Sequence, residues 1–326
     1  MTGTLAILIA ALLIDRLVGD PPRLWNRIPH PVVVFGWAIA GFDRSFNRKR
    51  MSAETRRFNG TVAIVVLLAA AALAGYVLHG LLAPFGLFGH VVEALLVAVF
   101  LAQKSLADHV RAVADGLRSG GIEGGRKAVS MIVGRNPATL DEPAVCRAAI
   151  ESLAENFSDG VVAPALWYAV FGLPGLLAYK MLNTADSMIG HKNSKYIDFG
   201  RASARLDDLA NWPAARLSAG LIAAGAWLRR GRRAARMAIG TAFRDSGLHR
   251  SPNSGWPEAA MAGALGISLA GPRVYGGARV DEPMMNAAGR SRTAATDIDS
   301  ALDIFGAACL TLAGLALACL LISLAF

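Results

Sequence analysis

Long uninterrupted apolar windows constrain this chain more than any other feature of its sequence. Windows 60–83 and 304–326 contain no Asp, Glu, Lys or Arg, and window 85–103 contains only Glu93 of these types. About 20 apolar residues let a helix cross the hydrocarbon core of a bilayer, and a helix satisfies its own backbone hydrogen bonds there. The alternative is a set of buried helices in a large soluble protein, which the continuity of the windows disfavours. We therefore predict transmembrane helices.

The composition agrees with this interpretation. The 326 residues are 54% hydrophobic and 17% charged, below the quarter or so of charged residues in soluble domains. The first apolar segment is short, ends at Asp15-Arg16, and lacks the flanks of a cleaved signal peptide. We predict an all-α polytopic integral membrane protein with re-entrant or broken helices, forming one membrane-embedded domain with spans at about 3–18, 60–83, 85–103 and 303–326.

The basic residues cluster beside apolar segments, and the formal net charge is +9. This distribution follows the positive-inside rule and predicts a cell (inner) membrane protein. Its anionic partners are then lipid headgroups or a phosphorylated substrate, and not nucleic acid. The two clusters consist of Arg44, Arg48, Lys49, Arg50, Arg56 and Arg57, and of Arg229, Arg230, Arg232, Arg233 and Arg236.

Two weaker apolar segments, 161–182 and 214–228, leave the topology open. The first is interrupted at 172–175 by glycines and a proline, which predicts two half-helices. The flanking basic clusters require that both segments span or that neither does. Broken helices in membrane proteins usually line a cavity. We favour re-entry, which places the polar loop 183–213 and a helical loop unit at 104–160 on the cytoplasmic side. The glycines of this unit predict breaks at Ser119-Gly120-Gly121 and at Gly124-Gly125.

Acidic residues recur every fourth position at Glu151, Glu155 and Asp159. If one helix contains all three, their carboxylates lie along one face and repel one another. A bound divalent cation would remove that cost, and oxygen ligands of this kind suit Mg²⁺. The alternative is a solvated acidic face. A further polar group, Asp15, Asp20 and His30, lies around a turn after the first apolar segment.

The densest polar stretch is 179–216, where acids, amides and bases alternate. Asp207 and Asp208 are candidate metal ligands. A mixture of cations and metal-bound carboxylates is typical of phosphoryl transfer. The alternative is juxtamembrane charge that anchors helices. The cations suited to phosphate are Lys180, Lys192, Arg201, Arg205 and Arg216.

A fourth stretch surrounds the turn sequence at 251–255. Glu258 opens a predicted small-residue helix over 259–269, whose N-terminus favours an anion. His249 and Glu258 are candidate general bases, although a lone His is more often structural. The chain contains no Walker A, Rossmann, nucleophile-elbow or His-Glu-x-x-His motif. Any ATP site is therefore unconventional.

Four strings of residues, taken in their order along the chain, resemble the integral-membrane amide synthases of cobalamin biosynthesis, the adenosylcobinamide-phosphate synthase family. The resemblance covers nearly the whole chain. Two positions depart from the family pattern. Asn136-Pro137 stands where Asp-Thr is usual, and His191 stands where an aromatic residue is expected. The strings are Gly19-Asp20-Pro21-Pro22 with Pro29-His30-Pro31, Glu151-Ser152-Leu153-Ala154-Glu155-Asn156, Asn183-Thr184-Ala185-Asp186-Ser187-Met188-Ile189-Gly190 with Arg205-Leu206-Asp207-Asp208, and Ser251-Pro252-Asn253-Ser254-Gly255-Trp256-Pro257-Glu258.

The resemblance implies ATP-dependent attachment of (R)-1-amino-2-propanol, or its O-phosphate, to the propionate carboxylate of adenosylcobyric acid, with Mg²⁺ beside ATP. We expect the active site to face the cytoplasm. A homo-oligomer and association with other corrinoid-pathway enzymes both stay open. The expected residues are catalytic His249, Glu258 and Asp186, substrate- or phosphate-binding Lys180, Asn183, Lys192, Arg201, Arg205 and Asn253, and metal-binding Asp207, Asp208, Glu151 and Glu155.

Three other classes of protein fit parts of the pattern. A secondary transporter for an anionic or corrinoid small molecule would explain broken helices and buried charges, but no two-half symmetry is visible. A CDP-alcohol phosphotransferase-like enzyme would need an Asp-Gly-x-x-Ala-Arg pattern, which is absent. A non-catalytic scaffold leaves the density of mixed polar motifs unexplained.

Overall fold

The computed structural model describes residues 2–133, 137–275, 278–280 and 282–325. Most of these residues are helical. The chain forms two compact units. The first unit contains Met1–Leu101, Ala163–Asn211 and Cys319–Phe326, and the second contains Ala102–Val162 and Trp212–Ala318.

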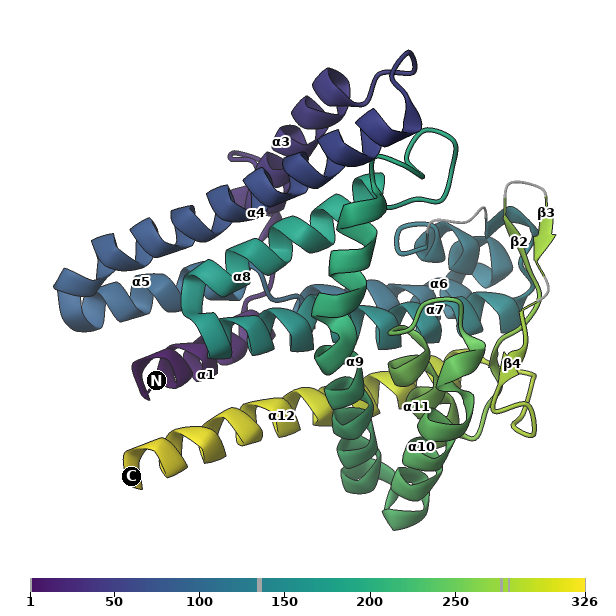
Figure 1. The fold of residues 1–326 in the computed structure, drawn as a ribbon. Helices are drawn as coiled ribbons and strands as arrows, with labels where there is room; N and C mark the ends of the chain where they lie inside the picture. The colour runs from purple at the N-terminus through teal and green to yellow at the C-terminus, as the bar shows by residue number, and fades with distance from the viewer. Residues whose placement is uncertain (1, 134–136, 276–277, 281, 326) are drawn as a thin grey trace. The chain divides into compact units, whose positions relative to one another are not determined.

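In the first unit, long helices lie side by side, with α4 along α8 and α1 along α5 (Figure 1). A Cβ atom on Gly75 of α4 would lie 2.6 Å from the backbone of Leu173 in α8. The two backbones are therefore in close contact, as small residues permit in membrane helix packing. The elements are α1 Thr2–Leu17, α2 Pro22–Trp25, α3 Pro31–Phe46, α4 Ala53–Leu82, η1 Ala83–Phe85, α5 Gly86–Val99, α8 Ala163–Ile189 and the first part of α9 Arg201–Arg230.

Local sequence signals set the helix starts in this unit. Ser52 Oγ accepts a hydrogen bond from Thr55 N at 3.2 Å, which caps α4. His30 Nδ1 accepts from Val32 N at 3.2 Å, and proline occupies the first position of α3. His30 is thus a helix cap, which is a structural role for one of the polar residues of the first turn.

The second unit contains helices joined by short turns. Helix α6 folds back on itself at Gly121, whose φ is 59°, so the predicted break at 119–121 is confirmed. Helix α7 packs on α6 and α11, and α10 packs on α11. The elements are α6 Gln103–Val129, η2 Pro137–Thr139, α7 Glu142–Phe157, a π-helical turn η3 Ser158–Val162, the remainder of α9, α10 Arg232–Asp245, η4 Ser246–Leu248, α11 Gly255–Leu265 and most of α12 Ala295–Ala325.

Two short antiparallel pairs interrupt the helical architecture. β1 Leu269–Ala270 pairs with β4 Met284–Met285, and β2 Arg273–Tyr275 pairs with β3 Ala278–Val280. Neither strand pair was predicted from the sequence. The prediction that the helix opened by Glu258 extends to residue 269 is wrong. Helix α11 ends at Leu265 because Gly266 adopts a left-handed cap with φ 67°.

Two further predictions about helices need correction. The polar loop 183–213 is shorter than expected, because α8 continues to Ile189 and α9 begins at Arg201. Helix α9 is one element that includes Pro213 and the apolar segment 214–228. The helical row of three carboxylates is also wrong, since α7 ends at Phe157 and a π-helical turn contains Asp159. By contrast, the break at 172–175 is confirmed, with φ 64° at Gly172.

Three helical segments, Ala53–Val129, Glu142–Ile189 and Ala295–Ala325, are long and apolar enough to cross a membrane. The first contains the windows 60–83 and 85–103, and the third contains residues 304–325 of the last window. Large apolar side chains on α4 are exposed, including Leu73 at 62% and Leu81 at 62%. Exposed apolar surface of this kind is typical of a membrane-facing helix. The number of crossings and their orientation stay predictions.

Candidate functional site

A buried carboxylate lies near the start of α9 in the first unit. The Asp207 side chain accepts a hydrogen bond from Asn211 Nδ2 at 2.8 Å through Oδ2, while its buried Oδ1 has no hydrogen-bond partner. Burial raises the pKa of Asp207 to about 7, and the charge of Asp186 adds to this effect. The amides of Asn211 and Asn183 act in the opposite direction. The predicted residues Asp186, Asn183 and Asp207 therefore lie together.

A tyrosine on α8 holds the amide that orients this carboxylate. Tyr179 Oη donates to Asn211 Oδ1 at 2.8 Å, and Asn211 Nδ2 donates to Asp207. Because the tyrosine occupies the amide oxygen, the amide nitrogen must face the carboxylate. Tyr179 and Asn211 lie in the polar stretch 179–216, but no role was predicted for either. Their only signal in the sequence was their polar character within that stretch.

The predicted cations of this unit differ in their surroundings. Lys192 lowers the pKa of Asp208, although burial of Asp208 raises it overall, so Lys192 lies near the acidic group. Lys180 is half-buried and its charge lies near His30. Arg201 and Arg205 are exposed. Neither arginine forms an ion pair within the ranges that the structure describes.

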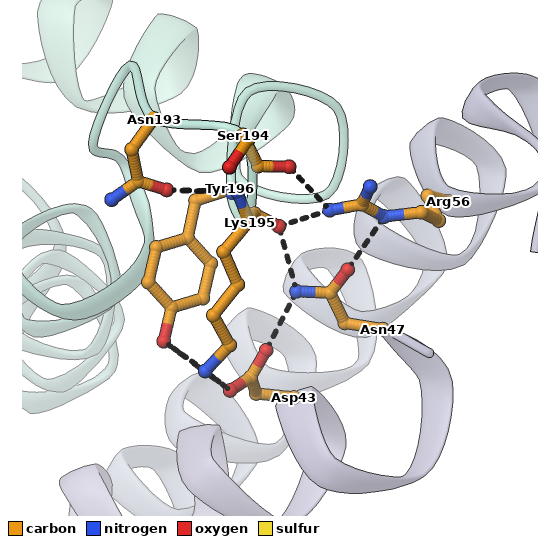
Figure 2. Close-up of polar contacts among 7 residues, drawn as sticks. All are labelled: Asp43, Asn47, Arg56, Asn193, Ser194, Lys195 and Tyr196. Atoms are coloured by element: carbon orange, nitrogen blue, oxygen red, sulfur yellow. Dashed lines mark hydrogen bonds and ion pairs between the residues drawn. The ribbon is translucent and has the colours of Figure 1, made fainter. Parts of the chain in front are cut away.

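The segment 190–200, which carries Lys192 and joins α8 to α9, is tied to α3 and α4 by polar contacts (Figure 2). Asn47 Nδ2 donates to Lys195 O at 3.1 Å, and the Arg56 guanidinium donates to the same carbonyl. Lys195 Nζ pairs with Asp43 Oδ2 at 2.8 Å. Tyr196 Oη also contacts that carboxylate, at 3.3 Å. We call Asp43, Asn47, Arg56 and Lys195 the clasp.

The clasp gives Arg56 a defined partner. Arg56 and Arg57 were predicted only as members of a basic cluster that sets the membrane orientation, yet both bind the 190–200 segment. Arg57 Nε pairs with Asp198 Oδ1 at 2.8 Å. The position of His191, unusual for the family, lies in the same segment, and its ring is 6.4 Å from that of Tyr196.

The second unit contains a separate polar cluster. Glu258 is 2% exposed, and its Oε1 lies 3.8 Å from His249 Nε2. This distance fits an ion pair and is too long for a hydrogen bond. His249 Nδ1 accepts from Ser251 N at 3.0 Å, so the proton of the neutral ring is on Nε2, toward Glu258. Both predicted general bases therefore face each other.

The two predicted acidic residues of α7 make hydrogen bonds in this unit. Glu155 Oε1 accepts from Ser254 Oγ at 2.8 Å. Glu151 Oε1 accepts from Ala270 N at 2.7 Å, and Ala270 is a non-glycine residue with φ 61°. Supporting that backbone is a structural role for Glu151. Within the described ranges, no three His, Cys, Asp or Glu side chains form a metal-binding group. The metal roles stay predictions.

Asn253 and Arg216 complete the second cluster. Asn253 Oδ1 accepts from Arg216 Nη1 at 2.9 Å, and the backbone N–H groups of Asn253 and Ser254 approach Ser251 Oγ at 3.3 Å. The predicted turn at 251–255 is confirmed by these contacts. Of the two residues in the departure at Asn136-Pro137, Asn136 lies outside the described part of the chain.

Apolar helices of membrane-spanning length, with buried acidic side chains in polar clusters, define a helical protein with candidate membrane spans. The chain belongs to the CobD/CbiB protein family, whose profile matches residues 8–305. This confirms the resemblance to the amide-forming synthases of cobalamin biosynthesis and identifies the chain as an enzyme of that family.

Curated relatives match over most of their length. The cobalamin biosynthesis protein CobD of Sinorhizobium sp is 67% identical over 98% of this chain and 99% of the relative. The protein of the same name from Rhizobium meliloti (strain 1021) is 68% identical over 94% and 93% of the two chains. That of Rhodobacter capsulatus is 46% identical over 86% of each. No solved structure matches the chain.

Proposed function

We propose that this chain forms the amide bond between (R)-1-amino-2-propanol, or its O-phosphate, and the propionate carboxylate of adenosylcobyric acid, with consumption of ATP. Family membership over residues 8–305 carries the proposal. The buried, partly unsatisfied carboxylate of Asp207 supports it, because such groups often mark functional sites. Family membership also favours an enzyme over the transporter considered above.

A free carboxylate is a poor acyl donor and must be activated first. In the first step, a propionate oxygen attacks a phosphorus atom of ATP, and the bond from that phosphorus to its leaving group breaks. In the second step, the amine nitrogen attacks the carbonyl carbon. The C–N bond forms, the activated C–O bond breaks with release of the phosphate or nucleotide group, and the amine loses a proton.

The first-unit cluster fits the charge balance of the activation step. Asp207 and Asp208 would contribute to a Mg²⁺ site that the phosphate oxygens of ATP complete, since Asp207 Oδ1 is buried without a hydrogen-bond partner and the described residues offer no group of three metal-binding side chains. The metal, when bound, would neutralise charge on the phosphates. Lys192 lies beside these acids and would contact a phosphate. We assign the same role to Lys180, Arg201 and Arg205, with Asn183 as a hydrogen-bond donor.

The second-unit cluster fits proton transfer from the attacking amine. Glu258 is buried in the second unit. His249 Nε2 faces Oε1 of this carboxylate at 3.8 Å. We assign proton acceptance to this pair. Glu258 would be the acceptor, and the Nε2 side of the His249 ring would face its carboxylate. Asn253, which was predicted to bind substrate, would act through Arg216.

One reconstitution tests the proposed reaction. Purified full-length protein in nanodiscs is incubated with adenosylcobyric acid, aminopropanol phosphate and Mg²⁺-ATP, and the products are separated by chromatography. We expect a corrinoid amide and one nucleotide product per amide. Absence of amide with both the free and the phosphorylated amine would refute the proposal. Asp207→Asn should abolish turnover, whereas Asp108→Asn, a change on the exposed face of α6, should not.

A further inference from the structure

Arg216 of α9 is held between aromatic rings in the second unit. Its guanidinium carbon lies 4.5 Å from the centroid of the Trp212 ring and 4.9 Å from that of Trp256. Trp212 comes from the same helix, and Trp256 comes from the start of α11. Two sequence-distant tryptophans therefore share one cation. Cation–π contacts of this kind are individually common, but two around one arginine form a more defined site.

Polar contacts use only part of the guanidinium. Nη1 donates to Trp212 O at 3.0 Å and to Asn253 Oδ1 at 2.9 Å. A guanidinium has five N–H donors. The two aromatic rings stack against its face and accept no conventional hydrogen bond from these donors. Within the described ranges, Nε and Nη2 of Arg216 have no hydrogen-bond acceptor. One edge of the fork is therefore available.

No carboxylate neutralises this cation among the described residues. Arg216 forms no ion pair there, although it is half-buried. Burial alone lowers the pKa of Arg216, with no acidic group acting against it. Two acids of the second unit have other contacts, since Glu155 accepts a hydrogen bond from Ser254 and Glu258 faces His249. A partly desolvated cation without a counter-ion is costly unless a ligand supplies the negative charge.

We infer that Arg216, walled by Trp212 and Trp256 and oriented by Asn253, binds a phosphate group of a substrate through its Nε/Nη2 edge. That edge matches two phosphate oxygens in a bidentate contact. The inference rests on the proposed function for the identity of the ligand, because ATP and aminopropanol phosphate both carry such a group. In this arrangement Asn253 is a positioning residue whose amide sets the rotation of the guanidinium.

Anion binding can be measured without turnover. Purified full-length protein in nanodiscs is equilibrated with radiolabelled inorganic phosphate, and bound label is determined by dialysis. We expect R216Q to raise the dissociation constant for phosphate by about tenfold or more, as for loss of a charge-assisted bidentate contact. R216K should lie between R216Q and wild type. R236Q, which removes an exposed arginine of α10, should bind phosphate as wild type does. Equal affinity in R216Q and wild type would overturn the inference.

Kinetics then distinguish the two sources of phosphate. If Arg216 binds the amine phosphate, R216Q raises the KM of aminopropanol phosphate about tenfold and leaves the KM of free aminopropanol unchanged. If it binds ATP, only the KM of ATP rises. Unchanged KM values for both phosphorylated substrates would overturn the inference. Failure of the proposed function has a different signature, in which wild-type protein forms no amide while dialysis still reports Arg216-dependent phosphate binding.

Discussion

At the scale of single residues, the polar side chains buried in this protein divide into those that support backbone and those whose atoms lack partners. Asp245 belongs to the first kind. It accepts two hydrogen bonds from Arg244, at 2.7 and 2.8 Å, and one from Asn286 N at 2.7 Å. Asn286 is a non-glycine residue with φ 50°. Asp245, at the end of α10, therefore stabilises the strained backbone at Asn286, directly after β4.

Stability should depend on the ionisation of Asp245. The hydrogen bonds from Arg244 lower its pKa below the usual 3.8, so its ionised form is favoured in the folded state. This stabilisation is present above the unfolded pKa and is lost as the pH falls through the folded pKa. We expect Asp245→Asn to cost roughly 1–3 kcal/mol at pH 7 and less near pH 3, measured by thermal unfolding. A cost independent of pH would contradict the assignment.

The relay from Tyr179 to Asp207 makes a second residue-scale prediction. Tyr179→Phe removes the donor to Asn211, so the amide no longer has a fixed orientation toward Asp207. We expect kcat to fall about tenfold, as for loss of one positioning hydrogen bond, with a smaller change in the KM of ATP. Tyr76→Phe is the matched control, because Tyr76 is 70% exposed on α4. Equal kcat in the two variants would remove the relay from the mechanism.

At the scale of elements, the 190–200 segment is defined by close backbone packing as well as by the clasp. A Cβ atom on Gly60 of α4 would lie 1.9 Å from Phe199 O. Phe199 itself is 1% exposed. Side chains beyond glycine at position 60 would push the segment, and Lys192 with it, away from α4. The glycine thus determines how closely the connection between α8 and α9 approaches the helix pair.

Gly60→Ala should therefore destabilise the protein by about 2 kcal/mol or more, the range for a forced overlap in a packed core. Gly80→Ala on the same helix has no neighbour within 4 Å of the added Cβ, and should be neutral or stabilising by up to about 1 kcal/mol. Thermal unfolding in detergent compares the two. Trypsin should also cleave Gly60→Ala faster after Lys192 and Lys195. Indistinguishable variants would show that the segment tolerates displacement.

At the scale of the whole molecule, the direction of the chain through the membrane is a prediction from charge alone. The basic clusters beside the spans, combined with re-entry of segments 161–182 and 214–228, predict that the 190–200 segment is cytoplasmic. The turn after α4 should then face the opposite side. Native thiols complicate labelling only at one position, because Cys146 and Cys309 are buried and Cys319 is exposed.

Labelling of single cysteines tests this orientation in a Cys319→Ala background. A membrane-impermeant maleimide should label Ser194→Cys in inverted vesicles and not in intact cells. Leu87→Cys, whose parent residue is 79% exposed at the start of α5, should show the reverse pattern. If Ser194→Cys is labelled from outside, the segment is external and the cytoplasmic assignment of the active site is wrong.

Sequence alone determined the helical class, the apolar windows, the breaks near Gly121 and Gly172, and the family, because hydrophobic length, glycine and long motifs are local signals. It also selected Asp186, Asn183 and Asp207, which the structure brings together. Only the tertiary structure decided that α9 is one helix through Pro213, that Glu151 supports Ala270, and that Tyr179 and Arg216 have specific partners. Those properties depend on contacts between residues far apart in the chain, for which a single sequence carries no local pattern.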